Sequence, residues 1–222
     1  MLAVVTGLLA GTLHVWSGPD HLAAIAPLAV RGRTRSWIAG VRWGLGHSAG
    51  VGAVGLLSFW LREWLPIEAL SAWGERLVGV TLVGIGVWGL QRALRTRVHT
   101  HRHAHDDAEH VHAHLHARRP THEGPVPHVH IHAAFGIGTL HGLAGSSHLL
   151  GVLPALAFST AAQAAAYLVA FGVGTIASMT MFAFLMGLVA THPAFNGERA
   201  TRGFMACVSA AALVVGCVWL VV

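Results

Sequence analysis

The chain has 222 residues, of which 54% are hydrophobic and only 10% are charged, a composition outside the range of soluble domains and inside that of membrane helix bundles. All 14 basic residues are arginines, and they gather at the ends of apolar segments. We therefore interpret them as membrane topology signals and exclude a nucleic-acid-binding surface. The composition predicts an all-α membrane protein.

Six apolar segments are long enough to cross a bilayer, which takes roughly 20 residues of helix. They lie at about residues 2–30, 37–61, 76–93, 133–157, 160–190 and 203–222. The first segment has no basic start and no small-residue cleavage site, so we expect it to remain in the mature protein. Twelve of the 14 arginines flank the first, third and fifth connections. The positive-inside rule then predicts a multi-pass protein of the inner or plasma membrane with both termini outside and residues 94–132 in the cytoplasm.

The first apolar segment carries polar residues at a depth where hydrocarbon disfavours them. Asp20 is the one acid well inside such a segment, where a charge costs at least ~2.5 kcal/mol, so we expect it to have a partner or a cation. His14 and His21 stand roughly 10 Å apart along an unbroken helix. A break at Gly18–Pro19 is therefore predicted to bring these side chains together. The alternative is a helix cap formed by Ser17 or the following glycine, with the acid beside the helix N-terminus.

Histidines reach the same depth in the second and fourth segments. Imidazole together with carboxylate suits nickel, cobalt and zinc, whereas copper(I) favours soft sulfur ligands. A histidine that hydrogen-bonds to a neighbouring helix is the alternative for each position. We predict metal ligands at His14, Asp20, His21, His47, His141 and His148, supported by Ser17, Gly18, Pro19, Ser48 and Thr175.

The third connection is rich in histidine, since residues 99–132 hold twelve of the 18 in the chain. Alternating His-x-His places ligands on one side of an extended chain, and without a fixed scaffold we expect labile metal sites of limited selectivity. A solvated polar linker is the alternative. The loop could collect ions before export, buffer them after import, or sense cytoplasmic metal. The predicted loop ligands are His99, His101, His103, His105, His110, His112, His114, His116, His128, His130 and His132.

An internal repeat relates the two halves of the chain. Residues 11–29 (GTLHVWSGPDHLAAIAPLA) and 138–156 (GTLHGLAGSSHLLGVLPAL) align at an offset of 127. We therefore predict a three-helix repeat at 1–93, the histidine-rich loop at 94–132, and a second three-helix repeat at 133–222. Because each repeat has an odd number of spans, the second is inverted, as in many secondary transporters. Helix 1 is expected to break near the midplane, and the same interpretation extends to helix 4.

Three motifs carry a resemblance to a known family: HVWSGPDH at 14–21, LGHS at 45–48 and HGLAGS at 141–146. They resemble motifs of the nickel/cobalt transporter superfamily, in particular its NicO-like and UreH-like (urease accessory) membrane proteins. In that family the first-helix histidine–aspartate motif and the second-helix histidine are implicated in metal recognition. The resemblance implies this role for His14, Asp20, His21 and His47.

These observations together predict a transporter of divalent transition-metal ions, nickel or cobalt first and zinc as a further candidate. We expect no enzymatic activity and no permanent cofactor. The expected partners are the metal ions, the bilayer, and a candidate metallochaperone or metalloenzyme, but no nucleic acid. No GxxxxGK[ST] motif is present. Two alternatives remain, an intramembrane metal-dependent hydrolase, and a metal sensor or delivery partner for a metalloenzyme such as urease. The absence of HExxH weighs against the hydrolase.

Overall fold

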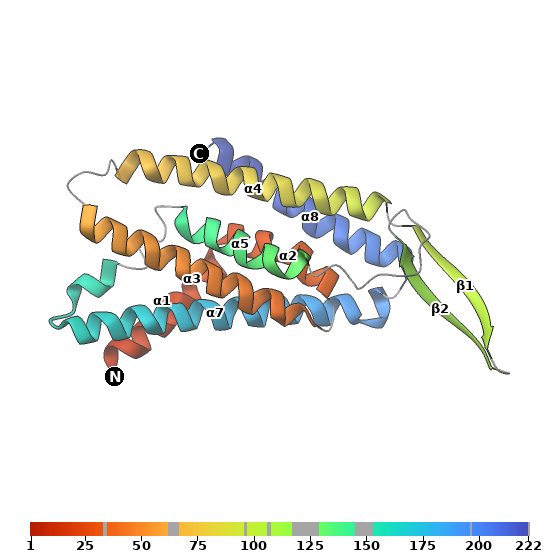
Figure 1. Cartoon of the computed structure of the whole chain (residues 1–222), viewed down its shortest axis with the longest axis horizontal. Helices are drawn as coiled ribbons and strands as arrows, with labels where there is room; N and C mark the ends of the chain where they lie inside the picture. Colours follow the sequence, from red (N-terminus) through yellow and green to blue (C-terminus); the bar gives the residue numbers. More distant parts are fainter. Residues whose placement is uncertain are drawn as a thin grey trace.

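The computed structural model describes residues 1–32, 35–61, 67–95, 97–105, 108–116, 129–144, 153–195 and 197–221. Long helices lie side by side in the body of the molecule, and a two-stranded hairpin projects from one end (Figure 1). In chain order the elements are α1 Leu2–Ser17, α2 Pro19–Gly32, α3 Ser36–Leu61, α4 Ile67–Arg95, β1 Arg97–His105, β2 Ala108–His116, α5 Val129–Leu143, η2 Leu153–Ala157, α7 Ala161–Thr191, η3 Pro193–Phe195 and α8 Glu198–Val221.

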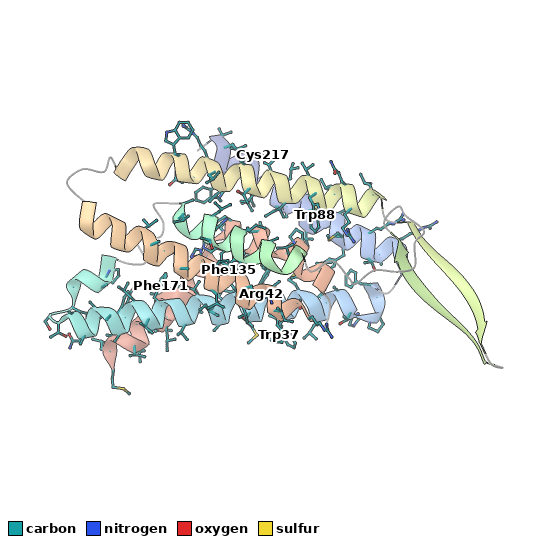
Figure 2. The ribbon with its side chains drawn as sticks, viewed as in Figure 1. Trp37, Arg42, Trp88, Phe135, Phe171 and Cys217 are labelled. Atoms are coloured by element: carbon teal, nitrogen blue, oxygen red, sulfur yellow. The ribbon has the colours of Figure 1, made fainter. Side chains whose placement is uncertain are left out.

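The helical body has the length and apolarity of a membrane protein. Among the described residues, three helices are long and apolar enough to cross a bilayer, and the α1–α2 pair makes a fourth if it is counted as one bent span. Large apolar side chains also cover the outside, and Trp37 and Phe135 are nearly half exposed (Figure 2). The three helices lie at Trp73–Leu94, Ala161–Thr191 and Arg199–Val221. The chain is thus a membrane protein, while the number of six spans stays a prediction.

The break expected in the first apolar segment is present. α1 ends at Ser17, Gly18 is extended with φ −92° and ψ 98°, and α2 begins at Pro19. Proline has no N–H to continue the hydrogen bonds of α1, and the two helices meet at a bend of 73°. The corresponding break in helix 4 is not tested, because α5 ends at Leu143 and residues 145–152 lie outside the described residues.

Glycines allow the main helix pairs to approach closely. α1 packs on α7, α3 on α5, and α4 on α8. A Cβ atom at Gly11 would overlap the carbonyl oxygen of Phe171, and one at Gly138 would overlap that of Trp43. Small residues at such contacts are typical of helix association in membranes. The two contacts match under the internal repeat, in which 11 aligns with 138 at the offset of 127 and 43 aligns with 171 at an offset of 128. A second matched pair joins Gly46 to Phe135 and Gly174 to Leu8.

The histidine-rich connection contains an antiparallel β-hairpin, so the expectation that this run lacks a scaffold is wrong for residues 97–105 and 108–116. The His-x-His alternation has the period of a strand, in which every second residue shares a face. Histidines therefore occupy facing positions, at His99↔His114, His101↔His112 and His103↔His110. Two predicted loop ligands, His130 and His132, fall inside α5 instead. His128 lies outside the described residues.

Candidate metal centre

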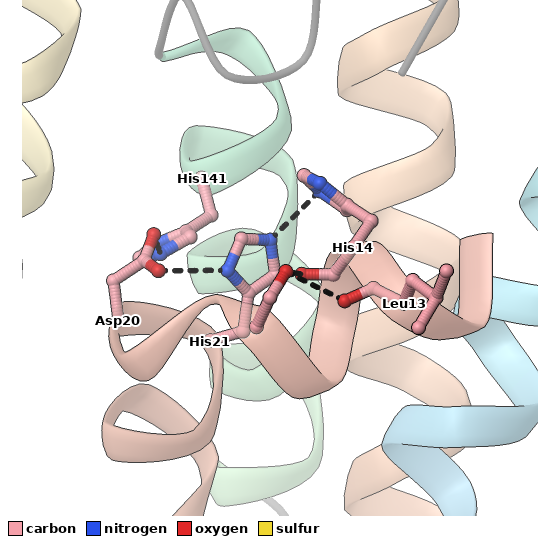
Figure 3. A network of polar contacts seen from close by, with 6 residues as sticks. Leu13, His14, Asp20, His21 and His141 are labelled. Atoms are coloured by element: carbon pink, nitrogen blue, oxygen red, sulfur yellow. Dashed lines mark hydrogen bonds and ion pairs between the residues drawn. The ribbon is translucent and has the colours of Figure 1, made fainter. Parts of the chain in front are cut away.

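Five polar residues from four helices meet inside the bundle. Figure 3 shows four of them, His14, Asp20, His21 and His141. His14 lies in the last turn of α1, and Asp20 and His21 open α2 just after the break. His47 comes from α3, and His141 comes from the last turn of α5. The side chains of His21, His47 and His141 are each at most 1% exposed, and Asp20 is 5% exposed. The structure thus brings together five of the six predicted ligands, and the sixth, His148, lies outside the described residues.

Asp20 is held by two imidazoles from different parts of the chain. Its Oδ1 lies 2.9 Å from Nδ1 of His21, and its Oδ2 lies 3.0 Å from Nε2 of His141. A carboxylate only accepts hydrogen bonds, so both nitrogens donate. Because the two oxygens are taken by side chains, this geometry argues against a simple helix cap. Asp20 instead links the start of α2 to α5 of the second half.

Three imidazoles converge beside this carboxylate. Nε2 of His21 lies 3.1 Å from Nε2 of His14. Ring centroids are 5.0 Å apart for His21 and His47 and 5.6 Å apart for His14 and His47. One nitrogen from each of the three lies within 4.8 Å of the others. Such a cluster of imidazole nitrogens is a ligand set for zinc, nickel, copper or iron.

A second group of possible ligands shares one member with the first. Asp20, His21 and His141 also offer atoms that all lie within 4.8 Å of one another. His21 belongs to both groups and uses a different ring nitrogen in each, Nε2 toward His14 and Nδ1 toward Asp20. The centre can therefore either hold an ion with three imidazoles and keep the carboxylate behind them, or hold it with the carboxylate itself.

Aromatic side chains form a wall around the centre that was missed from the sequence. The Trp43 ring stacks on His47 at 4.8 Å with an interplanar angle of 8°, and its centroid is 5.4 Å from that of His21. The ring centroid of Phe171 in α7 lies 5.5 Å from that of His14. Trp43 is fully buried, so the wall orients imidazole rings and excludes water. A sequence signal existed, since Trp43 precedes His47 by four residues, which places both on one helix face.

The predicted supporting residues have different outcomes. Ser17 is exposed, and its hydroxyl donates to backbone carbonyls of α1, to Leu13 at 2.6 Å and to His14 at 3.5 Å. A Cβ at Gly18 would stand 2.5 Å from Nδ1 of His21, so the glycine makes room for the ion-pairing side chains. Thr175 is fully buried one turn after Phe171, and its hydroxyl has no hydrogen-bond partner among the described residues. Pro19 starts α2, and the Ser48 hydroxyl faces Gly172 of α7.

Comparison with known proteins gives relatives in plants and bacteria. The chain is 40% identical over 165 residues to Chloroplast protein FOR GROWTH AND FERTILITY 1 of Arabidopsis thaliana, which covers 74% of this chain and 44% of the relative. It is 39% identical over 167 residues to FOR GROWTH AND FERTILITY 2 of the same plant, covering 74% and 41%. Urease accessory protein UreH of Bacillus sp. (strain TB-90) is 31% identical over 154 residues, covering 68% and 61%.

These relatives are longer than the aligned region, and the chain spans less than half the length of the two chloroplast proteins. The bacterial relative agrees with the UreH-like part of the resemblance seen in the motifs. No solved structure matches the chain. The profile described as the transmembrane region of cytochrome c biogenesis proteins matches residues 2–219, and the chain therefore belongs to that membrane-protein family.

Proposed function

We propose that the chain carries divalent transition-metal ions across a membrane, with nickel and cobalt as the first candidates and zinc as the next. The observation that carries the proposal is the convergence of His14, His21 and His47 on one point, with Asp20 directly behind them. Imidazole and carboxylate are the ligands these ions favour. Ionisable groups inside a membrane bundle also mark ion pathways.

The packing of the helices supports an arrangement suited to transport. α1 packs on α7, and α5 packs on α3. The repeat relates these two contacts, because α1 corresponds to α5 and α3 corresponds to α7. We therefore propose six spans in two inverted repeats, residues 1–93 and 133–222, joined by the loop at 94–132. The centre takes His141 from the second half and its other four members from the first. Rocking between repeats would open such a site to alternate sides.

The relatives favour this class of function over an enzyme. None of the three is named for an enzymatic activity, and one is named a urease accessory protein. A hydrolase would need a carboxylate or similar base free to activate water. Asp20 has both oxygens engaged by imidazoles. We propose that the carrier supplies a metalloenzyme such as urease, through a metallochaperone or directly. We also propose that the carrier lies in the inner or plasma membrane.

Reconstitution into proteoliposomes with a metal-sensitive dye inside tests the proposal. We expect Ni²⁺ or Co²⁺ to enter vesicles containing the wild type, and His47→Ala to abolish that flux. His192→Ala is the matched control, because His192 is an exposed imidazole at the end of α7 and lies outside the centre. A folded wild type that moves none of Ni²⁺, Co²⁺ and Zn²⁺ would refute the proposal.

A further inference from the structure

We infer that the ion is bound by three imidazoles, those of His14, His21 and His47, and that Asp20 is a positioning residue that His141 holds in place. The inference rests on the proposed function for the identity of the ion as the transported substrate. It goes further by dividing the five groups among three roles: ligand, positioning residue and support for that residue. Only three touch the ion, and the one carboxylate of the centre does not.

The first step of the argument is the tautomer of His21. Because Asp20 accepts a hydrogen bond from Nδ1, the proton of a neutral imidazole sits on that nitrogen. The lone pair is then on Nε2, which is the nitrogen that lies nearest His14. A metal-binding histidine commonly donates the N–H of its far ring nitrogen to a carboxylate, and this hydrogen bond fixes the ring and raises its basicity.

The second step is the spacing of the two nitrogens. Nε2 of His14 and Nε2 of His21 are 3.1 Å apart. Two nitrogen ligands at roughly 2.0–2.1 Å from a tetrahedral ion stand about 3.3 Å apart, so the observed separation is close to that of a bound ion. The ring of His47 faces the same point and is kept there by stacking on Trp43.

The third step is the position of Asp20. Each of its oxygens already accepts a hydrogen bond, one from His21 and one from His141. Direct ligation would place the ion on an oxygen that already accepts a hydrogen bond from one of these imidazoles. His141 approaches α3 closely because the next residue is Gly142, where a Cβ atom would overlap the carbonyl oxygen of His47. The second half of the chain thus acts on the ion through Asp20.

This arrangement leaves the ion exchangeable. Three protein ligands leave one position of a tetrahedral ion open to water, as in catalytic rather than structural zinc sites. His14 is the partly exposed member of the three, whereas His21 and His47 are buried. In the conformation described, the centre is therefore reached from the side of His14.

Cobalt(II) binding to the full-length protein in detergent tests this division of roles. The twelve histidines at 99–132 are first replaced by asparagine, so that the visible ligand-field bands of Co²⁺ report the centre. We expect Asp20→Asn to weaken Co²⁺ binding about 10–100-fold while the saturated spectrum keeps its shape. His47→Ala should change the spectrum itself, because it removes a ligand. His192→Ala should change neither.

A double-variant cycle gives a second, independent test. If His141 acts only through Asp20, His141→Ala weakens binding in the same direction, and adding it to Asp20→Asn causes no further loss. A saturated Asp20→Asn spectrum that changes as the His47→Ala spectrum does, or additive losses in the cycle, would overturn the inference. Flux is measured separately, so a three-imidazole spectrum without transport would refute the proposed function alone. Transport with a carboxylate ligand would refute this inference alone.

Discussion

Gly18 lies between α1 and α2, and its lack of a side chain lets the Asp20–His21 pair form. A Cβ there would stand 2.5 Å from Nδ1 of His21 and 2.9 Å from Oδ1 of Asp20. We expect Gly18→Ala to weaken Co²⁺ binding about 10–100-fold although every ligand is still present, because the positioning hydrogen bond is lost. Equilibrium titration measures this. Gly136→Ala is the control, since a Cβ there meets nothing within 4 Å, and unchanged binding in folded Gly18→Ala would contradict the prediction.

At the residue scale, membership of the centre could be predicted from sequence but the roles could not. Histidines and an acid stand out in apolar segments because hydrocarbon disfavours them, and this signal found His14, Asp20, His21, His47 and His141. Whether a carboxylate binds an ion or orients a ligand depends on ring orientation, which no spacing encodes. The aromatic wall was missed because aromatic side chains are ordinary in membrane helices.

At the scale of elements, whether the sequence predicts a helix end or a strand depends on how strong the local chemical signal is. Pro19 has no N–H to continue the hydrogen bonds of α1, and Gly18 before it allows the turn, so the break between α1 and α2 follows from sequence. The β1–β2 hairpin has a weaker signal, although its His-x-His alternation has the period of a strand. Its alternation is of histidine with other residues rather than of apolar with polar residues, and only the apolar pattern reports burial.

Two glycines that correspond in the repeat make a prediction about helix packing. We expect Gly11→Ala and Gly138→Ala each to lower the free energy of unfolding by about 1–3 kcal/mol, because both Cβ atoms would overlap backbone of a facing helix. Thermal unfolding in detergent measures the change. Gly203→Ala should be neutral or slightly stabilising, since its Cβ meets nothing within 4 Å and alanine is the better helix former. An unchanged free energy of unfolding in Gly11→Ala or Gly138→Ala would contradict the prediction and show that the facing helices move apart to accept the methyl group.

The hairpin is expected to gather ions without forming the selective centre. Replacing residues 97–116 by a short Gly/Ser linker should preserve flux at saturating metal and raise the metal concentration needed for half-maximal flux. We expect this because imidazoles at paired positions of the two strands are suited to concentrate metal ions. A variant that keeps the strands but replaces their eight histidines by threonine separates ligand loss from hairpin loss. Complete loss of flux in a folded deletion would place the hairpin in the permeation path.

The whole molecule has a predicted orientation that labelling can test. Twelve arginines flank the odd connections and two flank the second, which places residues 94–132 in the cytoplasm. In a chain with Cys207→Ser and Cys217→Ser, we expect Ala104→Cys to resist a membrane-impermeant maleimide added to intact cells. Permeabilised cells supply the positive control. Efficient labelling of intact cells would reverse the orientation.

The repeat could be predicted from sequence at one motif, but its consequence for packing could not. The aligned residues 11–29 and 138–156 do not say which helices touch. That information comes from the facing glycines and carbonyls, and it pairs α1 with α7 and α3 with α5. The span count does not follow from apolar length alone, because a segment such as 133–157 holds the separate elements α5 and η2, with residues outside the described ranges between them.

One carboxylate among neutral imidazoles also fixes the charge of the proposed carrier. Asp20 supplies the single negative charge among the five residues described at the centre. With neutral histidines, the empty centre carries −1, and a divalent ion brings it to +2 − 1 = +1. Moving one elementary charge across the whole bilayer at 100 mV changes its electrical energy by roughly 2.3 kcal/mol. The same voltage therefore drives the loaded and empty forms in opposite directions, and each complete cycle is electrogenic.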